Sequence, residues 1–397
     1  MKKWISMMLA LCLMIPCLGL GEEEDGDLMV EEIVESVEQV QIPEDADSDD
    51  VFVDEDTGET FYLTEEEQQK LDSLIEEEEA EEDEPDIDTD SLDLNPNLPE
   101  NVLNILLIGV DTRSKDPQEI IGRGDTQIIV SINRDTGAIR MTSILRDSLV
   151  PIPGYKNQTK INNAFQYGCN KVKKGTTQEK VRSGAALAMR TINRDFQMNI
   201  QHYVAVNFNG LASVIDAMGG IDMELTKGEA WYINKYLKEH PPAYDNKAKG
   251  ERTPLEVVAG TQHLDGVQAV MYARTRSLKG ENDFNRTDRQ RHLLDLLLQK
   301  VMSEMDALAL FDLIGTAADY SDTNMNIAFL VDLAVSLLPT LTQSKEAGEA
   351  LFEQMRVPMD HSYSYTQSNG SSVIKYSLTK HAQAIHEFIY GTYYPAK

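Results

Sequence analysis

Runs of hydrophobic residues and alternating patterns near the middle of the chain predict the strands of a β-sheet. Residues 102–110, VLNILLIGV, are almost continuously apolar, which is typical of a strand that is buried on both faces. Residues 126–133 and 138–145 alternate apolar and polar positions on either side of the turn sequence RDTG. This arrangement predicts a β-hairpin directly after the buried strand.

Helical and strand-like periods alternate in the next part of the chain. Residues 179–196 space their apolar positions along one face of a helix. Residues 202–208 predict a strand, and residues 211–218 predict a helix that Gly219-Gly220 would end before a strand at 221–225. Residues 227–261 are polar and contain two adjacent prolines, so we expect an insertion or a lid there.

The C-terminal third continues the alternation. We expect helices at 264–273, 287–305, 327–338 and 379–390, and strands at 354–357 and 373–376. Strands that alternate with helices, together with one hairpin, predict an α/β fold, a three-layer α-β-α sandwich on a mixed central sheet. In such folds the loops at the strand ends are the expected place for a functional site.

Charge is distributed unevenly along the 397 residues. Lys and Arg number 36 against 67 Asp and Glu, but residues 22–93 hold 34 of the acids and the single base Lys70. This composition predicts an acidic disordered stalk over residues 22–98. Residues 94–397 balance 33 acids with 33 bases, so this part can bury a core, and its lack of excess cations disfavours generic binding of nucleic acid.

The N-terminus has the pattern of an export signal. Lys2 and Lys3 precede an uncharged run over residues 4–20, which is typical of either a signal peptide or an N-terminal membrane anchor. Both alternatives place the rest of the chain in the cell envelope, outside the cytoplasm. We therefore expect a leader at 1–21, a stalk at 22–98, a main domain at 99–305, and a C-terminal extension of helices and strands at 306–397 that packs on the main domain.

Several common chemistries lack their sequence signals. Cys169 is the one cysteine outside the leader, which excludes a disulfide framework and a cysteine-based zinc site. The chain has no G-x-S-x-G elbow, Walker A sequence, H-E-x-x-H pair or G-x-G-x-x-G after a strand. Acyl transfer, ATP hydrolysis and zinc-dependent hydrolysis are therefore disfavoured.

Acidic residues and arginines gather instead at the ends of the predicted strands. Asp111 follows the first strand, Asp125 precedes the second, and Arg146 follows the third. The segment from residue 272 to 291 adds further arginines. These groups predict a site for an anionic ligand, although carboxylates at such positions can also be helix caps or turn formers.

The spacing within the arginine-rich segment favours a diphosphate. Arg274 and Arg276 would point the same way in an extended chain, and Arg286, Arg289 and Gln290 would share one face of a helix. Guanidinium groups that converge can hold phosphate oxygens in pairs. The alternative is a charged helix face that contacts only solvent.

Seven segments resemble, in the same order, the LytR-CpsA-Psr family of cell-envelope proteins. They are NILLIGVDTR, GRGDTQIIVSIN, MTSILRDS, KINNAF, VIDAMGGID, LDGVQAVMYARTR and DFNRTDRQRHLL. The resemblance implies that residues 99–305 form a catalytic domain. It would transfer a glycopolymer from a polyprenyl-pyrophosphate carrier to the muramic-acid C6 hydroxyl of peptidoglycan, with formation of a phosphodiester. The implied partners are the carrier-linked glycopolymer, peptidoglycan and the lipid face of the membrane, with no nucleic acid.

The resemblance also implies roles for individual residues. Asp111 and Asp125 would hold Mg²⁺ against the pyrophosphate, and Asp283 would orient an arginine or accept a proton. The phosphate-binding set would be Arg146, Lys160, Arg274, Arg276, Arg286, Arg289 and Gln290. In this chemistry Mg²⁺ and arginines would stabilise the charge that develops on phosphate oxygens.

Two other functions stay open. Water could replace the sugar hydroxyl at the same site, which would make the protein a polyprenyl-pyrophosphate hydrolase. A non-catalytic protein could use the arginines only to bind or sense wall polymers. The paired aspartates Asp111 and Asp125 favour an enzyme, because a protein that only binds polyanions gains nothing from carboxylates beside the phosphates.

Overall fold

The computed structural model describes the main body of the chain and short stretches elsewhere. The described ranges are residues 51–53, 60–62, 69–70, 73, 87–112, 119–239, 252–275, 320–326, 352–368 and 370–396, with single positions 289, 292, 293, 296, 297, 300, 313, 329 and 333. Residues 22–81 form a unit separate from the rest of the chain. Its described part contains an antiparallel pair, β1 (Val51–Val53) and β2 (Thr60–Tyr62), inside the predicted disordered stalk.

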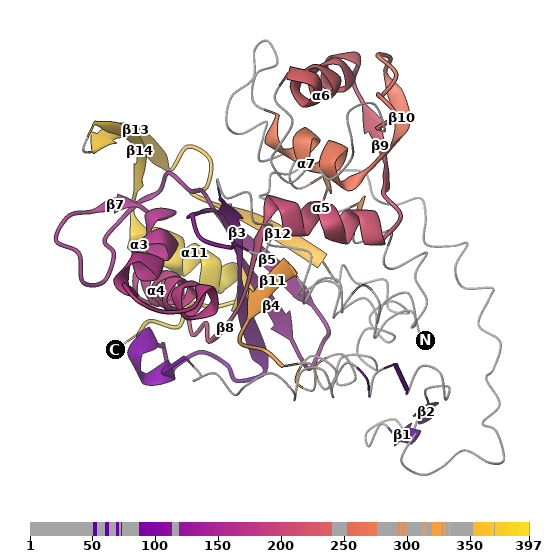
Figure 1. Ribbon diagram of the computed structural model, residues 1–397. Coiled ribbons are helices and arrows are strands. Elements are labelled where there is room, and N and C mark those ends of the chain that lie inside the picture. Colours follow the sequence, from indigo (N-terminus) through magenta and orange to yellow (C-terminus); the bar gives the residue numbers. More distant parts are fainter. Residues whose placement is uncertain are drawn as a thin grey trace. The chain divides into compact units, whose positions relative to one another are not determined.

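A six-stranded mixed sheet forms the centre of the main unit (Figure 1). Its order is β11 (Ser321–Thr323), β8 (His202–Asn207), β3 (Val102–Asp111), β4 (Arg123–Asn133), β5 (Ile139–Ile144) and β12 (Phe352–Val357). β3 is antiparallel to β4 and parallel to β8, while β5 is antiparallel to β4 and parallel to β12. The α/β fold class and the mixed central sheet are thus confirmed.

Both faces of the sheet are buried, because its central strands are apolar at successive positions. Leu106 and Ile108 of β3 join a core cluster with helices α3 (Asn163–Lys171), α4 (Thr177–Phe196) and α11 (Leu378–Tyr390). Ile105 and Leu107 point to the opposite face and are fully buried as well. The continuous apolar run at 102–110 is explained by this double burial.

Local signals fix both ends of helix α4. Thr176 and Glu179 form a capping box at the start of α4, and Gln197 ends it in the left-handed conformation. The main unit also contains several short elements. They are the 3-10 helix η4 (Thr89–Leu92) and the strands β6 (Leu149–Val150), β7 (Thr159–Lys160), β13 (Tyr363–Ser368) and β14 (Ser371–Tyr376).

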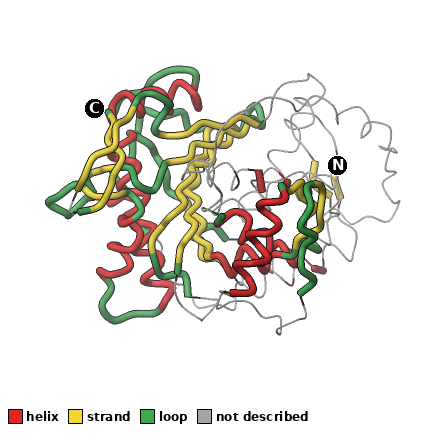
Figure 2. Tube along the Cα trace, turned by 90° about the horizontal axis from the view of Figure 1, so that it is seen from above, coloured by secondary structure: helices red, strands yellow, loops and turns green. Residues whose placement is uncertain are grey.

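A second group of elements follows β8 in the sequence. It contains α5 (Phe208–Ala217), the antiparallel pair of β9 (Ile221–Leu225) and β10 (Gly260–Leu264), α6 (Lys227–Glu239) and α7 (Gly266–Arg274). A side chain at Gly266 would collide with the backbone of Ala212, so a glycine is required where α7 crosses α5. In Figure 2 the strands of the sheet run between α3, α4 and α11 on one side and α5 to α7 on the other.

The predicted boundaries differ from the structure in three places. The globular unit begins before residue 98, because Leu92 and Leu98 are buried and Asn95 donates to the carbonyl oxygens of Gln197 and Tyr394. The polar stretch expected as an insertion begins with a regular helix, α6. The predicted C-terminal extension supplies both edge strands of the sheet, β11 and β12.

No helix among the described residues combines the length and the apolar character that a membrane crossing requires. The predicted leader at residues 1–21 lies outside the described part.

Candidate active site

Three of the predicted site residues, Asp111, Asp125 and Arg146, lie at one edge of the central sheet. Since β3, β5, β8 and β12 run in the same direction, all four strands end there, and antiparallel β4 begins there. Asp111 is the last residue of β3, Arg146 follows β5, and Asp125 is the third residue of β4. Ligands of open α/β sheets bind at this kind of edge.

Asp125 occupies a β-bulge. Gly109 pairs with Thr126 and Val110 pairs with Gly124, so Asp125 is the extra residue on β4. A bulge bends the strand and redirects the side chain at that position, and bulges are frequent beside active sites. The bulge therefore explains how an otherwise buried strand turns a carboxylate toward the sheet edge.

Both oxygens of the Asp125 carboxylate accept hydrogen bonds. Arg146 Nη1 donates to Oδ2 at 2.7 Å, and Asn162 Nδ2 donates to Oδ1 at 2.7 Å. The Arg146 and Asp125 side chains are only 19% and 14% exposed. This partial burial strengthens the pairing relative to a surface ion pair.

A second ion pair lies beside the first. Lys160 Nζ donates to Asp147 Oδ1 at 2.5 Å. The segments that carry these groups are joined by their backbones, because Ile161 N donates to Ser148 O at 2.9 Å and Leu149 pairs with Lys160 between β6 and β7. The fold therefore holds one acid–base pair next to another in a fixed register.

Asp111 differs from Asp125 in its surroundings. Its side chain is half-buried, and among the described residues it makes no ion pair or side-chain hydrogen bond. It lies opposite Arg123 in the ladder, and Val110 pairs with Gly124, the neighbour of Asp125. The two carboxylates thus lie on adjacent strands at the same edge.

These two carboxylates fit a Mg²⁺ ion by the chemistry of their donors. Mg²⁺ is usually held by one or two carboxylates and completes its shell with water and substrate phosphates. Asp111 offers a carboxylate without a side-chain partner in the described region, and Asp125 keeps lone pairs beyond its two hydrogen bonds. The described residues contain no group of three or more His, Cys, Asp and Glu side chains suited to a metal, so a full protein cage is not formed there.

Arg274 is stacked at the same edge. It ends α7, and its guanidinium lies 4.3 Å from the ring centroid of Phe208, which begins α5 directly after β8. The distance is typical of a cation–π interaction, which holds the side chain without using its hydrogen-bond donors.

Arg289 is buried in an ion pair instead. Its Nε donates to Glu229 Oε1 at 2.7 Å, and the two side chains are 7% and 10% exposed. Burial raises the pKa of Glu229, but hydrogen bonds from Arg289 and Thr226 outweigh it and leave the pKa below its usual value. Arg289 therefore lies between α6 and Thr275, to whose carbonyl oxygen it donates a hydrogen bond. Its role as a phosphate ligand stays a prediction.

Four other predicted site residues lie outside the described part of the chain: Arg276, Asp283, Arg286 and Gln290. Conversely, the sequence interpretation gave no role to Asn162, Asp147, Glu229 or Phe208. Asn162 and Asp147 stood beside Lys160 and Arg146 in segments already singled out. Glu229 stands three residues after Thr226, the spacing of a capping box, which the structure forms, whereas Phe208 carried no signal.

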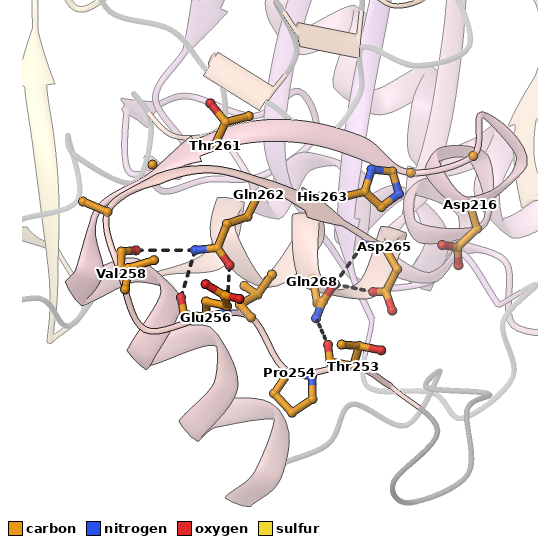
Figure 3. Close-up of a pocket in the computed structure, with 15 residues that line it drawn as sticks. Asp216, Thr253, Pro254, Glu256, Val258, Thr261, Gln262, His263, Asp265 and Gln268 are labelled. Atoms are coloured by element: carbon orange, nitrogen blue, oxygen red, sulfur yellow. Dashed lines mark hydrogen bonds between the residues drawn. The ribbon is translucent and has the colours of Figure 1, made fainter.

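A hollow of about 710 Å³ lies apart from this edge, beside β10 and the loop of residues 253–259 (Figure 3). None of the predicted site residues lines it. Two of its polar side chains are bonded to the backbone of its lining: Gln268 donates to Thr253 O, and Gln262 bonds both the N–H and the carbonyl oxygen of Glu256. We therefore assign the candidate site to the sheet edge and not to this hollow.

Comparison with known proteins gives consistent relatives. The chain is 32% identical over 241 residues to a polyisoprenyl-teichoic acid–peptidoglycan teichoic acid transferase TagU from Oceanobacillus iheyensis, a match that covers 61% of the chain and 62% of the relative. A TagU from Enterococcus faecalis is 28% identical over 232 residues, which is 58% of the chain and 64% of the relative. The matches thus span less than two thirds of these relatives' own lengths.

A solved structure shares the fold. The crystal structure of protein gbs0355 from Streptococcus agalactiae matches with a TM-score of 0.52 and 24% identity, and the match covers 73% of the chain and 88% of that protein. The model of the LytR_cpsA_psr family matches residues 61–385, a range that contains the sheet, the bulge and every predicted site residue. The chain belongs to the LytR_cpsA_psr family.

Proposed function

We propose that the protein is a phosphotransferase that moves a glycopolymer from a polyprenyl-pyrophosphate carrier to peptidoglycan, outside the cytoplasm. The observation that carries the proposal is the bonded cluster of Asp125, Arg146 and Asn162 at the sheet edge, beside Asp111 and the stacked Arg274. Membership of the family and the names of the TagU relatives support this substrate class.

The reaction exchanges one phosphorus–oxygen bond for another. The acceptor hydroxyl, in the family the muramic-acid C6 hydroxyl, would form a bond to the phosphorus that carries the glycan. The bond from that phosphorus to the bridging oxygen would break, the polyprenyl phosphate would leave, and the hydroxyl proton would pass to a base. No nucleotide is required, because the pyrophosphate bond is already activated.

The described residues can supply positioning and charge. Arg146, Lys160 and Arg274 would neutralise the phosphate oxygens, whose charge grows in the transition state. Asn162 would keep the Asp125 carboxylate in one orientation. Arg276, Arg286, Arg289 and Gln290 would complete the phosphate-binding set, and Asp283 would orient an arginine or accept the proton.

Asp111 and Asp125 would hold a Mg²⁺ ion. A bound Mg²⁺ supplies a Lewis acid for phosphate oxygens. The protein's own part is to present two hard oxygen donors at the sheet edge and to limit the positions that the Asp125 carboxylate can take, through Arg146 and Asn162.

The direct test is reconstitution. Full-length protein is incubated with a polyprenyl-pyrophosphoryl glycan, a peptidoglycan oligomer and Mg²⁺, and the conjugate is identified by mass spectrometry. Asp125→Asn should lower the rate by about 10²–10³, the usual effect of losing one preorganised electrostatic contact. Asp135→Asn is the matched control, because Asp135 lies in the exposed turn after β4 and, among the described residues, its carboxylate accepts a hydrogen bond only from Asn101.

Three results would contradict the proposal in different ways. Glycan phosphate released without conjugate would indicate the hydrolase alternative. Retention of the carrier lipid without turnover would indicate a binding or regulatory protein. Full transfer in excess chelator, or full activity of Asp111→Ala, would contradict the metal assignment alone.

A further inference from the structure

One face of helix α6 exposes three lysines and a tryptophan. Lys227, Trp231, Lys235 and Lys238 are all exposed, Trp231 to 49%. At 3.6 residues per turn these positions lie within about 80° of one another around the helix axis. We refer to these four residues as the lysine–tryptophan face. Lys235 Nζ lies 4.8 Å from the centroid of the Trp231 ring, so the cation and the ring already contact each other.

The opposite side of α6 is buried and ties the helix to the arginine-rich segment. Glu229, Ala230 and Ile233 are the buried positions of α6, and Glu229 holds Arg289. The lysine–tryptophan face is therefore separated from Arg289 by the thickness of one helix, about 10 Å.

Among the described residues, the acids near this face leave its charge positive. Within α6 the one exposed acid is Glu239, at the last residue, and Glu256 is exposed directly before Val257, so the three lysines outnumber these two acids. Strand β9 exposes Asp222 and Glu224, but it alternates these with the buried residues Ile221, Met223 and Leu225. Side chains alternate across a strand, so the two acids point away from the side on which the helices pack.

A neighbouring loop adds exposed apolar side chains. Val257 and Val258 are 39% and 49% exposed. The loop that carries them is braced at two points, because Asn234 of α6 bonds both the N–H and the carbonyl oxygen of Leu255, and Gln262 does the same for Glu256 (Figure 3). The two valines are thus held outward on a fixed loop next to α6.

We propose that the lysine–tryptophan face, with the Val257-Val258 loop, docks on an anionic membrane surface. Tryptophan prefers the membrane–water interface, where the ring is half in the apolar layer and half in water. Lysines attract anionic headgroups while their stems lie along apolar surface. Exposed valines gain from insertion between lipids, whereas a soluble polyanionic glycopolymer would use the lysines and leave the valines in water.

This inference deepens the proposed function, on which it rests for the location of the carrier lipid in the membrane. A docked α6 would hold the sheet edge close to the headgroup layer, where the pyrophosphate of the carrier lies. Docking and transfer are nevertheless separate measurements, so either can fail without the other.

The test uses the intrinsic fluorescence of Trp231. The chain contains two tryptophans, Trp4 and Trp231, so Trp4→Phe leaves Trp231 as the single tryptophan, which is excited selectively over tyrosine. The full-length variant is reconstituted in vesicles of phosphatidylglycerol and phosphatidylcholine, with or without brominated acyl chains. Docking predicts a blue-shifted emission that brominated lipid quenches, and both effects should weaken in pure phosphatidylcholine.

Charge variants decide whether the lysines matter. Lys227→Gln, Lys235→Gln and Lys238→Gln combined should lower the docking equilibrium constant by about 10²-fold, which is about 3 kcal/mol at about 1 kcal/mol per lysine. Lys173→Gln with Lys174→Gln, in the exposed turn before α4, is the matched control and should change nothing.

Two outcomes would overturn the proposal. The first is Trp231 emission that stays at the wavelength of an exposed indole and is insensitive to brominated lipid. The second is a shift produced by soluble poly(glycerol phosphate) at equal phosphate concentration but not by vesicles, which would make the face a glycopolymer site. Val257→Ser combined with Val258→Ser should reduce the quenching of Trp231 by brominated lipid relative to the Trp4→Phe protein. Undiminished quenching in that variant would show that the loop is not part of the docking surface.

Discussion

The buried ion pair between Glu229 and Arg289 gives the most quantitative prediction. Glu229→Gln would leave the guanidinium of Arg289 buried and without its counter-charge. Arg289→Gln would leave the Glu229 carboxylate in the same condition. We expect each single change to destabilise the protein strongly, and the double change to cost less than the sum of the two.

The magnitude follows from the burial of the pair. With an N···O distance of 2.7 Å and exposures of 7% and 10%, removal of one partner should cost about 3–5 kcal/mol, the usual range for a broken buried pair. Glu229 also accepts hydrogen bonds from the Thr226 N–H and hydroxyl. Part of the stability lost in Glu229→Gln would therefore come from weaker capping at the start of α6. The coupling energy of the pair should therefore lie at about 1–3 kcal/mol in a double-mutant cycle.

The assay is urea unfolding of the four proteins of the cycle, followed by circular dichroism. The exposed pair Arg190–Asp93, at 2.8 Å, is the comparison, and Asp93→Asn should cost no more than about 1 kcal/mol. Single changes at Glu229 and Arg289 that cost as little as Asp93→Asn would refute the structural role. Arg289→Lys that unfolds normally but loses transfer would show instead that Arg289 contacts the substrate.

Two further predictions concern residues beside the site. Asn162→Ala removes one of the two hydrogen bonds to Asp125 and should lower kcat for transfer about tenfold, since such bonds to a charged group are worth about 1.5–3 kcal/mol; an unchanged kcat would contradict this. Burial raises the pKa of Asp195 to about 7, with Arg194 opposing the shift. The folded protein therefore holds a proton that the unfolded chain releases near pH 4, and stability should fall as pH rises from about 4 to 7, by up to about 1.4 kcal/mol per pH unit. Asp195→Asn should abolish this slope in urea unfolding midpoints, and an identical slope in both proteins would refute it.

The strands that could be predicted are those whose patterns are local. β3 is recognisable because its burial on both faces demands a continuous apolar run, and β4 and β5 because a turn sequence separates them. β11 has the sequence SDT and joins the sheet only by pairing with β8. A three-residue polar strand has no period to detect, so it follows from tertiary structure alone.

The candidate site shows the same division. Asp111, Asp125 and Arg146 were predictable because strand ends of a mixed sheet converge on one edge, whatever the details of the loops. The bulge that redirects Asp125 has no sequence signature, and neither does the hydrogen bond from Asn162. Such features depend on the register between strands, which the pattern of one strand does not determine.

Helix α6 explains why no helix was predicted between residues 227 and 239. A helix is normally recognised by one broad apolar face, but the buried side of α6 carries Glu229 and its outer side carries the lysine–tryptophan face. The acid is tolerated inside because Arg289, distant in the sequence, neutralises it there. If the outer side docks on a membrane, its lysines and Trp231 are also suited to their surroundings. The polar sequence of α6 is then explained by its two sides, because one side binds the buried guanidinium of Arg289 and the other binds an anionic surface.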